Sequence, residues 1–277
     1  MFCSSGIDKS RINNMTSLEL LEARLDNLLS TALEETKNID LFVPIRKDEC
    51  SICFIPLPLE EKYTTFMNCC GKTICEGCLF KDMWKEIEKG KQRHLCAFCR
   101  KPTNEGNYIK DMKKLMKNNN PEAFIQMAKK HVLGSDGVFQ SNTRALEMYI
   151  RAAELGSANG FMNIGLYHSF GDGSIVVEHN MTKARSFVEI AAKKGLVDAH
   201  RWLANYDSRI GNISTCNEHL KIAARAGDKR SMDDLMTVYK SNLLSKDELT
   251  QTLREHQASM NEMKSEDRKQ AHLVLHK

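Results

Sequence analysis

Eight of the ten cysteines of this chain lie in one segment of fifty residues, and only two lie elsewhere. They are Cys50, Cys53, Cys69, Cys70, Cys75, Cys78, Cys96 and Cys99. Three of their pairs have the form Cys-x-x-Cys, a turn that brings two sulfur atoms onto one metal ion. Zn²⁺ binds four thiolates in a tetrahedron, so eight cysteines close two sites with none left over. A lone Cys-x-x-Cys would be weak evidence, but this cluster predicts two Zn²⁺ ions.

The alternative to metal binding is a set of disulfide bonds or unpaired thiols. The first residues, MFCSSGIDKSRINNM, have no apolar core of signal-peptide length, and no stretch approaches the roughly 20 apolar residues of a membrane span. We therefore expect an intracellular protein, cytoplasmic or nuclear, with no membrane contact. Thiols stay reduced there, and clustered cysteines are more often metal ligands than disulfides. A hydrophobic content of 42% with 27% charged residues is typical of a soluble globular protein.

The spacing of the cysteines narrows the type of zinc module. Fifteen residues separate Cys53 from Cys69, and seventeen separate Cys78 from Cys96. The order of a long loop, a close central pair, a Cys-x-x-Cys, a second long loop and a final Cys-x-x-Cys resembles a RING finger over residues 49–102. In that family the first and third ligand pairs hold one ion, and the second and fourth hold the other. Interleaved sites of this kind let a short segment fold on the free energy of metal binding.

The resemblance implies a specific division of the ligands. The first Zn²⁺ would be held by Cys50, Cys53, Cys75 and Cys78. The second would be held by Cys69, Cys70, Cys96 and Cys99.

Two positions depart from the common RING pattern. The centre reads CCGKTIC, with Lys72 where a ligand histidine usually lies, so the adjacent cysteines must supply that ligand, as in the all-cysteine RING subgroup. His94 is an alternative donor, although the eight cysteines already complete both sites. Ala97 replaces the proline that RING ligases usually carry in the last Cys-x-x-Cys. That proline supports the partner-binding groove, so its replacement bears on activity more than on fold.

The resemblance implies a ubiquitin-protein ligase without catalytic residues of its own. RING ligases bind a ubiquitin-conjugating enzyme and hold its thioester-linked ubiquitin in a reactive geometry, which is a positioning effect. The family's contact positions correspond here to Ile52, Trp84 and Arg100. Each has a plainer interpretation as local core, as the buried face of a short helix over residues 80–88, or as a surface charge. A non-catalytic adaptor with a structural RING is the competing hypothesis.

Residues 16–35 predict an N-terminal helix. Leucines at positions 18, 21, 25, 28 and 29 follow helical spacing, and Thr16 with Glu19 forms a capping box. The apolar stripe fits either a helix packed on the rest of the chain or a coiled coil that makes a homodimer. Residues 36–48, which include Pro44, are expected to be a linker.

A repeat follows the cysteine segment. Small residues at Ala123, Gly160, Ala199 and Ser231 are each followed four positions later by an apolar residue, at spacings of 37, 39 and 32. The strings AAELG, AAKKG and AARAG recur with the last two of these spacings. Such a register predicts helical hairpins in which small residues allow close approach and a glycine ends the second helix. The strings resemble Sel-1-like repeats, relatives of tetratricopeptide repeats, and the resemblance implies an all-α solenoid that binds proteins.

Four further repeat positions carry side chains that merit attention: His131, His168, Asp207 and Tyr239. They occupy one register in successive repeats, so packing or groove lining is expected rather than a metal or catalytic site. The last repeat is expected to end in a longer helix opened by Ser245 and Glu248, because the end of a solenoid must cover its apolar face.

The chain has a formal net charge of +4, and residues 79–120 carry eleven Lys/Arg against five Asp/Glu. An acidic partner or nucleic acid would suit this stretch, but it lacks the interleaved aromatic residues of nucleic-acid binders, so nucleic acid is not expected as a partner.

The expected organisation is a disordered N-terminus at 1–15, a helix and linker at 16–48, a RING-type finger at 49–102, a basic linker at 103–120, about three and a half to four repeats at 121–265, and a tail at 266–277. The RING would recruit the conjugating enzyme, and the repeats a substrate or scaffold.

Overall fold

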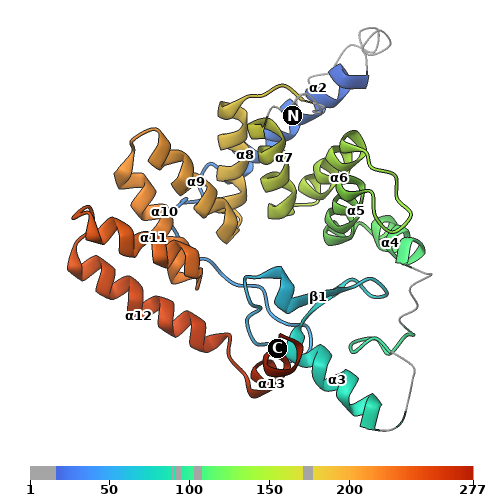
Figure 1. The fold of residues 1–277 in the computed structure, drawn as a ribbon. Helices are drawn as coiled ribbons and strands as arrows, with labels where there is room; N and C mark the ends of the chain where they lie inside the picture. Colours follow the sequence, from blue (N-terminus) through green and yellow to red (C-terminus); the bar gives the residue numbers. More distant parts are fainter. Residues whose placement is uncertain (1–16, 89, 91–94, 103–107, 171–176, 277) are drawn as a thin grey trace.

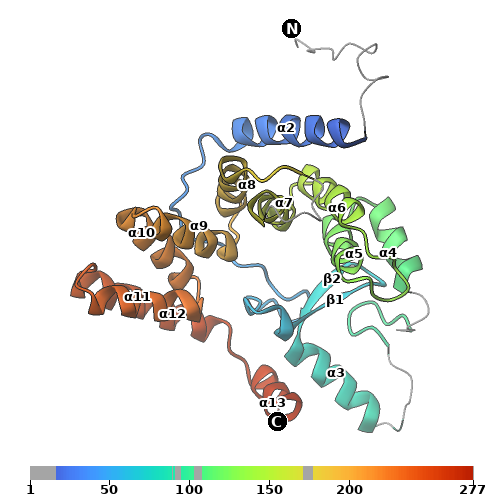
Figure 2. The same ribbon diagram turned by 45° about the horizontal axis from the view of Figure 1, so that its top comes forward.

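The computed structural model describes residues 17–88, 90, 95–102, 108–170 and 177–276. Its helices form an arc around a small two-stranded sheet, and this arrangement is visible in both views (Figures 1 and 2). The sheet belongs to the cysteine module, which we define as the described residues of 49–102. No helix among the described residues is long and apolar enough to cross a membrane.

The cysteine module contains little regular structure. The 3₁₀ turn η1 (Glu61–Tyr63) leads into β1 (Thr64–Met67), which pairs antiparallel with β2 (Lys72–Cys75), and α3 (Glu76–Glu88) follows at once. The buried core of the module consists of Met67, Ile74 and four of the cysteines, with the other four partly buried against it. With so few apolar side chains, the module lacks a hydrophobic core that could fold it alone, so another source of stability is needed.

The predicted helical repeats are confirmed as four helical hairpins. In chain order the hairpins are α5 (Pro121–Leu133) with α6 (Asn142–Glu154), α7 (Ala158–Phe170) with α8 (Met181–Lys193), α9 (Val197–Arg209) with α10 (Ile213–Arg225), and α11 (Lys229–Lys240) with α12 (Lys246–Glu262). We call these eight helices the repeat arc. Side chains of Asn120, Ser141, Asn180 and Asp228 cap helix N-termini, and Ser245 with Glu248 forms the expected capping box.

The small residues of the repeat register lie where helices approach closely. A Cβ atom on Gly160 would stand 2.5 Å from the backbone nitrogen of Ala153, and one on Gly165 would stand 2.7 Å from Val188. The glycines that end the AAxxG strings have φ values of 87°, 87° and 104°, in the left-handed region that glycine adopts without strain. These contacts give the predicted register its physical basis.

His131 and His168, the two histidines of the repeat register, have equivalent structural roles. His131 Nδ1 lies 3.1 Å from the carbonyl oxygen of Phe139, and His168 Nδ1 lies 3.1 Å from that of Glu178. Both rings therefore hold the chain that leaves the first helix of their hairpin. This is the packing role expected for them.

The N-terminal helix α2 (Ser17–Thr36) packs on the repeat arc. Leu21, Leu25, Leu28 and Ala32 are buried against the core of the first hairpins, and α2 contacts α6 and α8. Figure 2 shows α2 on the side of these helices that faces away from the sheet. The apolar stripe is thus used within the chain, against the alternative of a homodimer through this helix. Thr16 and the side chain of Leu18 lie outside the described residues.

The segment from residue 37 to 48 runs along the half of the repeat arc that contains α9 to α12. Phe42 lies against His219 with ring centroids 5.0 Å apart, and Ile45 packs against Val197 and Ala223. Lys47 Nζ donates to Ser259 Oγ at 2.6 Å. This stretch, expected as a linker, is therefore fixed along the repeats.

Two further segments differ from their expected description. The basic linker contains α4 (Tyr108–Lys117), whose Met112 is buried against α5. The C-terminal tail forms α13 (Glu266–Leu275), which packs on α3. Both helices have narrow apolar faces among many charged residues, and composition therefore concealed them.

Candidate metal centre

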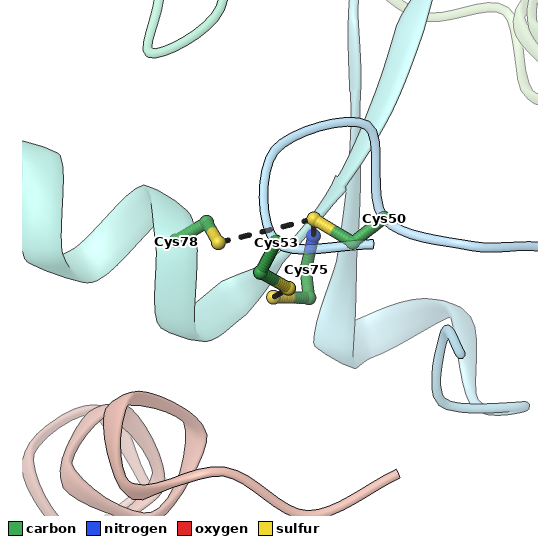
Figure 3. Close-up of side chains that lie close together, drawn as sticks. All are labelled: Cys50, Cys53, Cys75 and Cys78. Atoms are coloured by element: carbon green, nitrogen blue, oxygen red, sulfur yellow. Dashed lines mark hydrogen bonds between the residues drawn. The ribbon is translucent and has the colours of Figure 1, made fainter. Parts of the chain in front are cut away.

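The structure brings the eight cysteines together in two groups of four. Within each group one sulfur per residue lies within 4.8 Å of the others. One group is Cys50, Cys53, Cys75 and Cys78; the other is Cys69, Cys70, Cys96 and Cys99. We call them the first and second quartets. They are the groups that a cross-brace requires, and Figure 3 shows the four sulfur atoms of the first quartet directed toward one another.

The sulfur spacing fits a tetrahedral ion. Cys50 and Cys78 are 3.9 Å apart at their sulfurs, as are Cys53 and Cys75. In the second quartet the sulfurs of Cys69 and Cys99 are 3.5 Å apart, and those of Cys70 and Cys96 are 3.9 Å apart. A Zn–S bond of about 2.3 Å requires sulfur separations of about 3.8 Å in a tetrahedron. The described cysteines are free thiols, so the donors are available to a metal.

The first and last Cys-x-x-Cys turns have the same backbone geometry. Cys50 N donates to Ile55 O at 3.0 Å, and Cys96 N donates to Lys101 O at 2.7 Å. The residue four positions after the first cysteine of each turn is left-handed, at φ 57° for Phe54 and 62° for Arg100. The repeated geometry directs two sulfurs of each turn to the same side.

Backbone donors and burial shape the acidity of the thiols. Burial opposes ionisation of Cys50, but hydrogen bonds from the backbone of Cys53, Cys75 and Ile52 outweigh it and lower the pKa of Cys50 to about 7. Burial and the neighbouring cysteines raise the pKa of Cys70 to about 11 and raise that of Cys78 as well. Within the first quartet the pKa of Cys50 is lowered while that of Cys78 is raised, so a nearby cation would favour ionisation of both thiols. The donor set therefore fits a divalent metal, whose binding releases protons.

The structure also shows the surroundings of Lys72 in the CCGKTIC segment. Lys72, at the usual histidine position, points its Nζ over the ring of Phe98 at 5.9 Å from the centroid, a cation–π contact. It is not part of either quartet. His94 lies outside the described residues.

The three predicted partner-contact residues occupy different surroundings. Ile52 is half-buried against the cysteine core. Trp84 is 50% exposed and stacks on Phe80. Arg100 pairs with Asp82 and, at 3.1 Å, with Glu86.

The two faces of α3 separate Trp84 from Arg100. Because each helical residue advances by about 100°, Asp82 lies on the side of α3 opposite to Trp84. The helix therefore stands between the tryptophan and the carboxylates that bind the arginine, and the two residues do not form one continuous patch.

A buried polar cluster in the repeat arc surrounds Asp207. Its histidines, His200 and His219, could not be recognised as partners from the sequence. His200 Nδ1 lies 3.1 Å from His219 Nδ1, so one ring donates and the other accepts. His219 Nε2 is 3.7 Å from the fully buried carboxylate of Asp207, which pairs with Arg185 at 3.4 Å. Burial lowers the pKa of His200 to about 4 and that of His219 to about 3, so both rings are neutral at pH 7. No metal group forms at this cluster among the described residues.

The histidine pair predicts a pH dependence of stability. The folded pKa values lie below the ordinary value of about 6.5, so the unfolded chain binds more protons and stability falls as pH drops from about 6.5. At pH 5 each histidine should cost about 2 kcal/mol. The His219→Gln variant should lose less stability between pH 7 and pH 5 than the wild type in urea unfolding followed by circular dichroism. The exposed His179→Gln variant is the control, and identical pH slopes for all three proteins would contradict the assignment.

Comparison with known proteins gives likenesses of structure only. No protein-family model and no curated protein sequence matches the chain. A Sel1 repeat protein from Oxalobacter formigenes is similar in structure, with 23% identity, a TM-score of 0.49, and coverage of 65% of this chain and 71% of that one. So is c5321, a protective antigen present in uropathogenic Escherichia coli strains displaying an SLR fold, with 16% identity, a TM-score of 0.47, and coverage of 66% of this chain and 38% of that one.

Proposed function

We propose that this chain is a zinc-dependent RING-type protein that acts as a ubiquitin-protein ligase. The observation that carries the proposal is the interleaving of the two quartets. Each combines one cysteine pair from before β2 with a pair that comes later in the chain, and both have sulfur separations suited to Zn²⁺. In this proposal two Zn²⁺ ions are bound, one by each quartet.

The metal ions would have a structural role. Four thiolates complete the coordination of Zn²⁺ and leave no open position for water or substrate. The ions would supply folding free energy to a module that has few apolar side chains. Activity would therefore come from the surface that the metals hold in place.

That surface would receive a ubiquitin-conjugating enzyme. Phe54 and Trp84 project from the cysteine module with 70% and 50% of their surface exposed, and Ile87 and Phe98 are exposed as well. Large aromatic side chains that remain exposed to solvent favour a binding site for a protein partner. Ile52 supports this surface from the first Cys-x-x-Cys, and Arg100 would act where ubiquitin and the enzyme meet.

The repeat arc would recruit a substrate or a scaffold. The cysteine module lies on the inner side of the arc (Figure 1), and α2 covers part of the other side at α6 and α8. Phe139, Phe170 and Ile210, in or next to the connections between paired helices, are exposed. A protein partner on these connections would be held at a fixed distance from the conjugating enzyme.

The second candidate is a non-catalytic adaptor. The observation that favours it is the engagement of Arg100 by Asp82 and Glu86, which occupies the guanidinium that a ligase would use to bridge two proteins. Ala97 in place of proline is consistent with the same function. In an adaptor the zinc module would hold the arc in shape and bind a partner without promoting transfer.

An autoubiquitination assay with a panel of conjugating enzymes tests the proposal. Ile52→Ala should abolish binding of the conjugating enzyme. Arg100→Ala should leave binding nearly intact and slow ubiquitin transfer, because arginine would act on the bound thioester rather than on the enzyme's docking. Ala97→Pro should preserve or raise transfer. All three variants should retain two zinc ions, since none of these residues is a metal donor.

The outcome also separates the two candidates. If the wild type and Ala97→Pro are both inert with every conjugating enzyme while both zinc ions stay bound, the ligase function fails and the adaptor takes its place. Transfer that is lost together with zinc would indicate an unfolded module and would not bear on the contact surface.

A further inference from the structure

The C-terminal helix α13 is docked against the first quartet through a glycine between two of its cysteines. Gly77 lies between Cys75 and Cys78 in α3. A Cβ atom there would stand 2.6 Å from the backbone nitrogen of Arg268 and 2.8 Å from the carbonyl carbon of Asp267. Only glycine allows this approach, so the backbones of α13 and α3 are in direct contact beside the metal site.

The guanidinium of Arg268 connects α13 to a sulfur of that quartet. Its Nη2 donates to Cys53 Sγ at 3.9 Å and to the carbonyl oxygen of Ile55 at 3.2 Å. Its Nη1 donates to the carbonyl oxygens of Pro56 at 2.7 Å and Met263 at 2.5 Å. Four acceptors from two distant parts of the chain thus converge on one side chain. The planar fork of arginine suits this arrangement, which a lysine ammonium would reproduce only in part.

The charge of a zinc-loaded first quartet explains why a guanidinium at Cys53 would be favourable. A Zn²⁺ ion with four thiolates carries a net charge of −2, and a nearby guanidinium compensates part of that charge. Groups that hydrogen-bond to metal ligands orient them and strengthen metal binding. The loop from Cys53 to Pro56 is held in place by the same side chain that contacts the sulfur.

The second quartet has no such partner. Among the described residues, no lysine or arginine side chain donates to Cys69, Cys70, Cys96 or Cys99. Gly71, next to Cys70, packs instead against Leu115 of α4 and Asn120, which caps α5. The two metal sites therefore differ in their surroundings, and the second serves as an internal reference for the first.

We propose that Arg268 is a positioning residue of the first metal site, so that metal retention by the first quartet and docking of α13 stabilise each other. This inference rests on the proposed binding of zinc. It makes the C-terminal helix part of the zinc module, although residues 103–265 separate the two in the sequence.

The test is the rate at which zinc passes from the full-length protein to a chromogenic chelator. The wild type should release two zinc ions in two phases. In Arg268→Gln one phase should become ten to a hundred times faster, as is usual when an outer partner of a metal ligand is removed, and the other should not change. Arg268→Lys should give an intermediate rate. The matched control is Lys81→Met, which removes the 2.8 Å ion pair with Asp267 that also holds α13 but does not touch a sulfur.

The accelerated phase is assigned with Cys70→Ser, which removes the second site and should leave the phase that Arg268→Gln accelerates. Hydrogen exchange supplies the reciprocal readout, because amides of α13 should exchange faster in Cys78→Ser than in the wild type. Unchanged rates in Arg268→Gln, equal acceleration of both phases, or an equal effect of Lys81→Met would each overturn the role of Arg268. A wild type that binds no zinc would instead show that the proposed metal function fails.

Discussion

Replacing Cys78 by serine should unfold the cysteine module, with loss of zinc, while the repeat arc stays helical. Cys78 is a buried member of the first quartet, and its sulfur lies 3.9 Å from that of Cys50. A structural zinc ion supplies on the order of 10 kcal/mol of folding free energy at pH 7, far more than the few apolar side chains of the module can replace. Cys53→Ser should behave in the same way. Elemental analysis and limited proteolysis of residues 50–100 measure the two effects.

The matched control is Cys216→Ala. Cys216 of α10 is also buried, but it lies in an apolar cluster formed by residues of α9 to α12 and belongs to neither quartet. This variant should keep both zinc ions and lose about 1 kcal/mol of stability through its smaller side chain. Normal zinc content and a protected module in Cys78→Ser would contradict the assignment of the first quartet.

Phe187→Ala should lower the free energy of unfolding of the repeat arc by about 3–5 kcal/mol. Phe187 in α8 is fully buried, with its ring centroid 6.5 Å from that of Phe161 and 5.7 Å from that of His168. Truncation would leave a cavity at the centre of the second hairpin, where close-packed backbones cannot collapse to fill it. Urea unfolding followed by far-ultraviolet circular dichroism measures the change.

Leu133→Ala is the control for this substitution. Leu133 ends α5 and is 71% exposed, so its loss should change stability by no more than about 0.5 kcal/mol. Zinc content should be normal in both variants, because neither residue touches the cysteine module. A loss below 1 kcal/mol in Phe187→Ala would mean that the second hairpin is not packed as described.

The repeat arc could be predicted from sequence because its packing requires particular residue sizes. The position of Gly160 accepts no larger residue beside Ala153, and Gly195 and Gly227 have positive φ angles at the ends of helices. Such requirements leave a mark at fixed spacing, which the sequence shows directly. The grouping of the cysteines was accessible for a similar reason, since the number and spacing of ligands restrict how eight sulfurs can share two ions.

The helices at the edges of the domains could not be predicted in this way. Burial of Met112 in α4 and Ala271 in α13 involves single apolar residues among many charges. Their positions depend on contacts with distant segments, such as Arg268 with the loop after Cys53. Local sequence carries no signal for a contact of that kind.

The buried histidine pair was hidden for a related reason. His200 and His219 come from α9 and α10, the two helices of the third hairpin. The repeat register singled out Asp207 but did not indicate which side chains face it. The division of Trp84 and Arg100 between two sides of α3 likewise depends on which carboxylates the arginine meets. These features follow from tertiary packing, which the sequence specifies only as a whole.

The most direct test of the central claim is the zinc content of the purified protein and two variants. Elemental analysis should give two zinc ions per chain in the wild type, because the eight cysteines form two quartets of suitable geometry. Cys70→Ser should retain one ion and His94→Ala should retain two. One zinc ion or none in the wild type, or loss of zinc in His94→Ala with retention in Cys70→Ser, would contradict the two-site account.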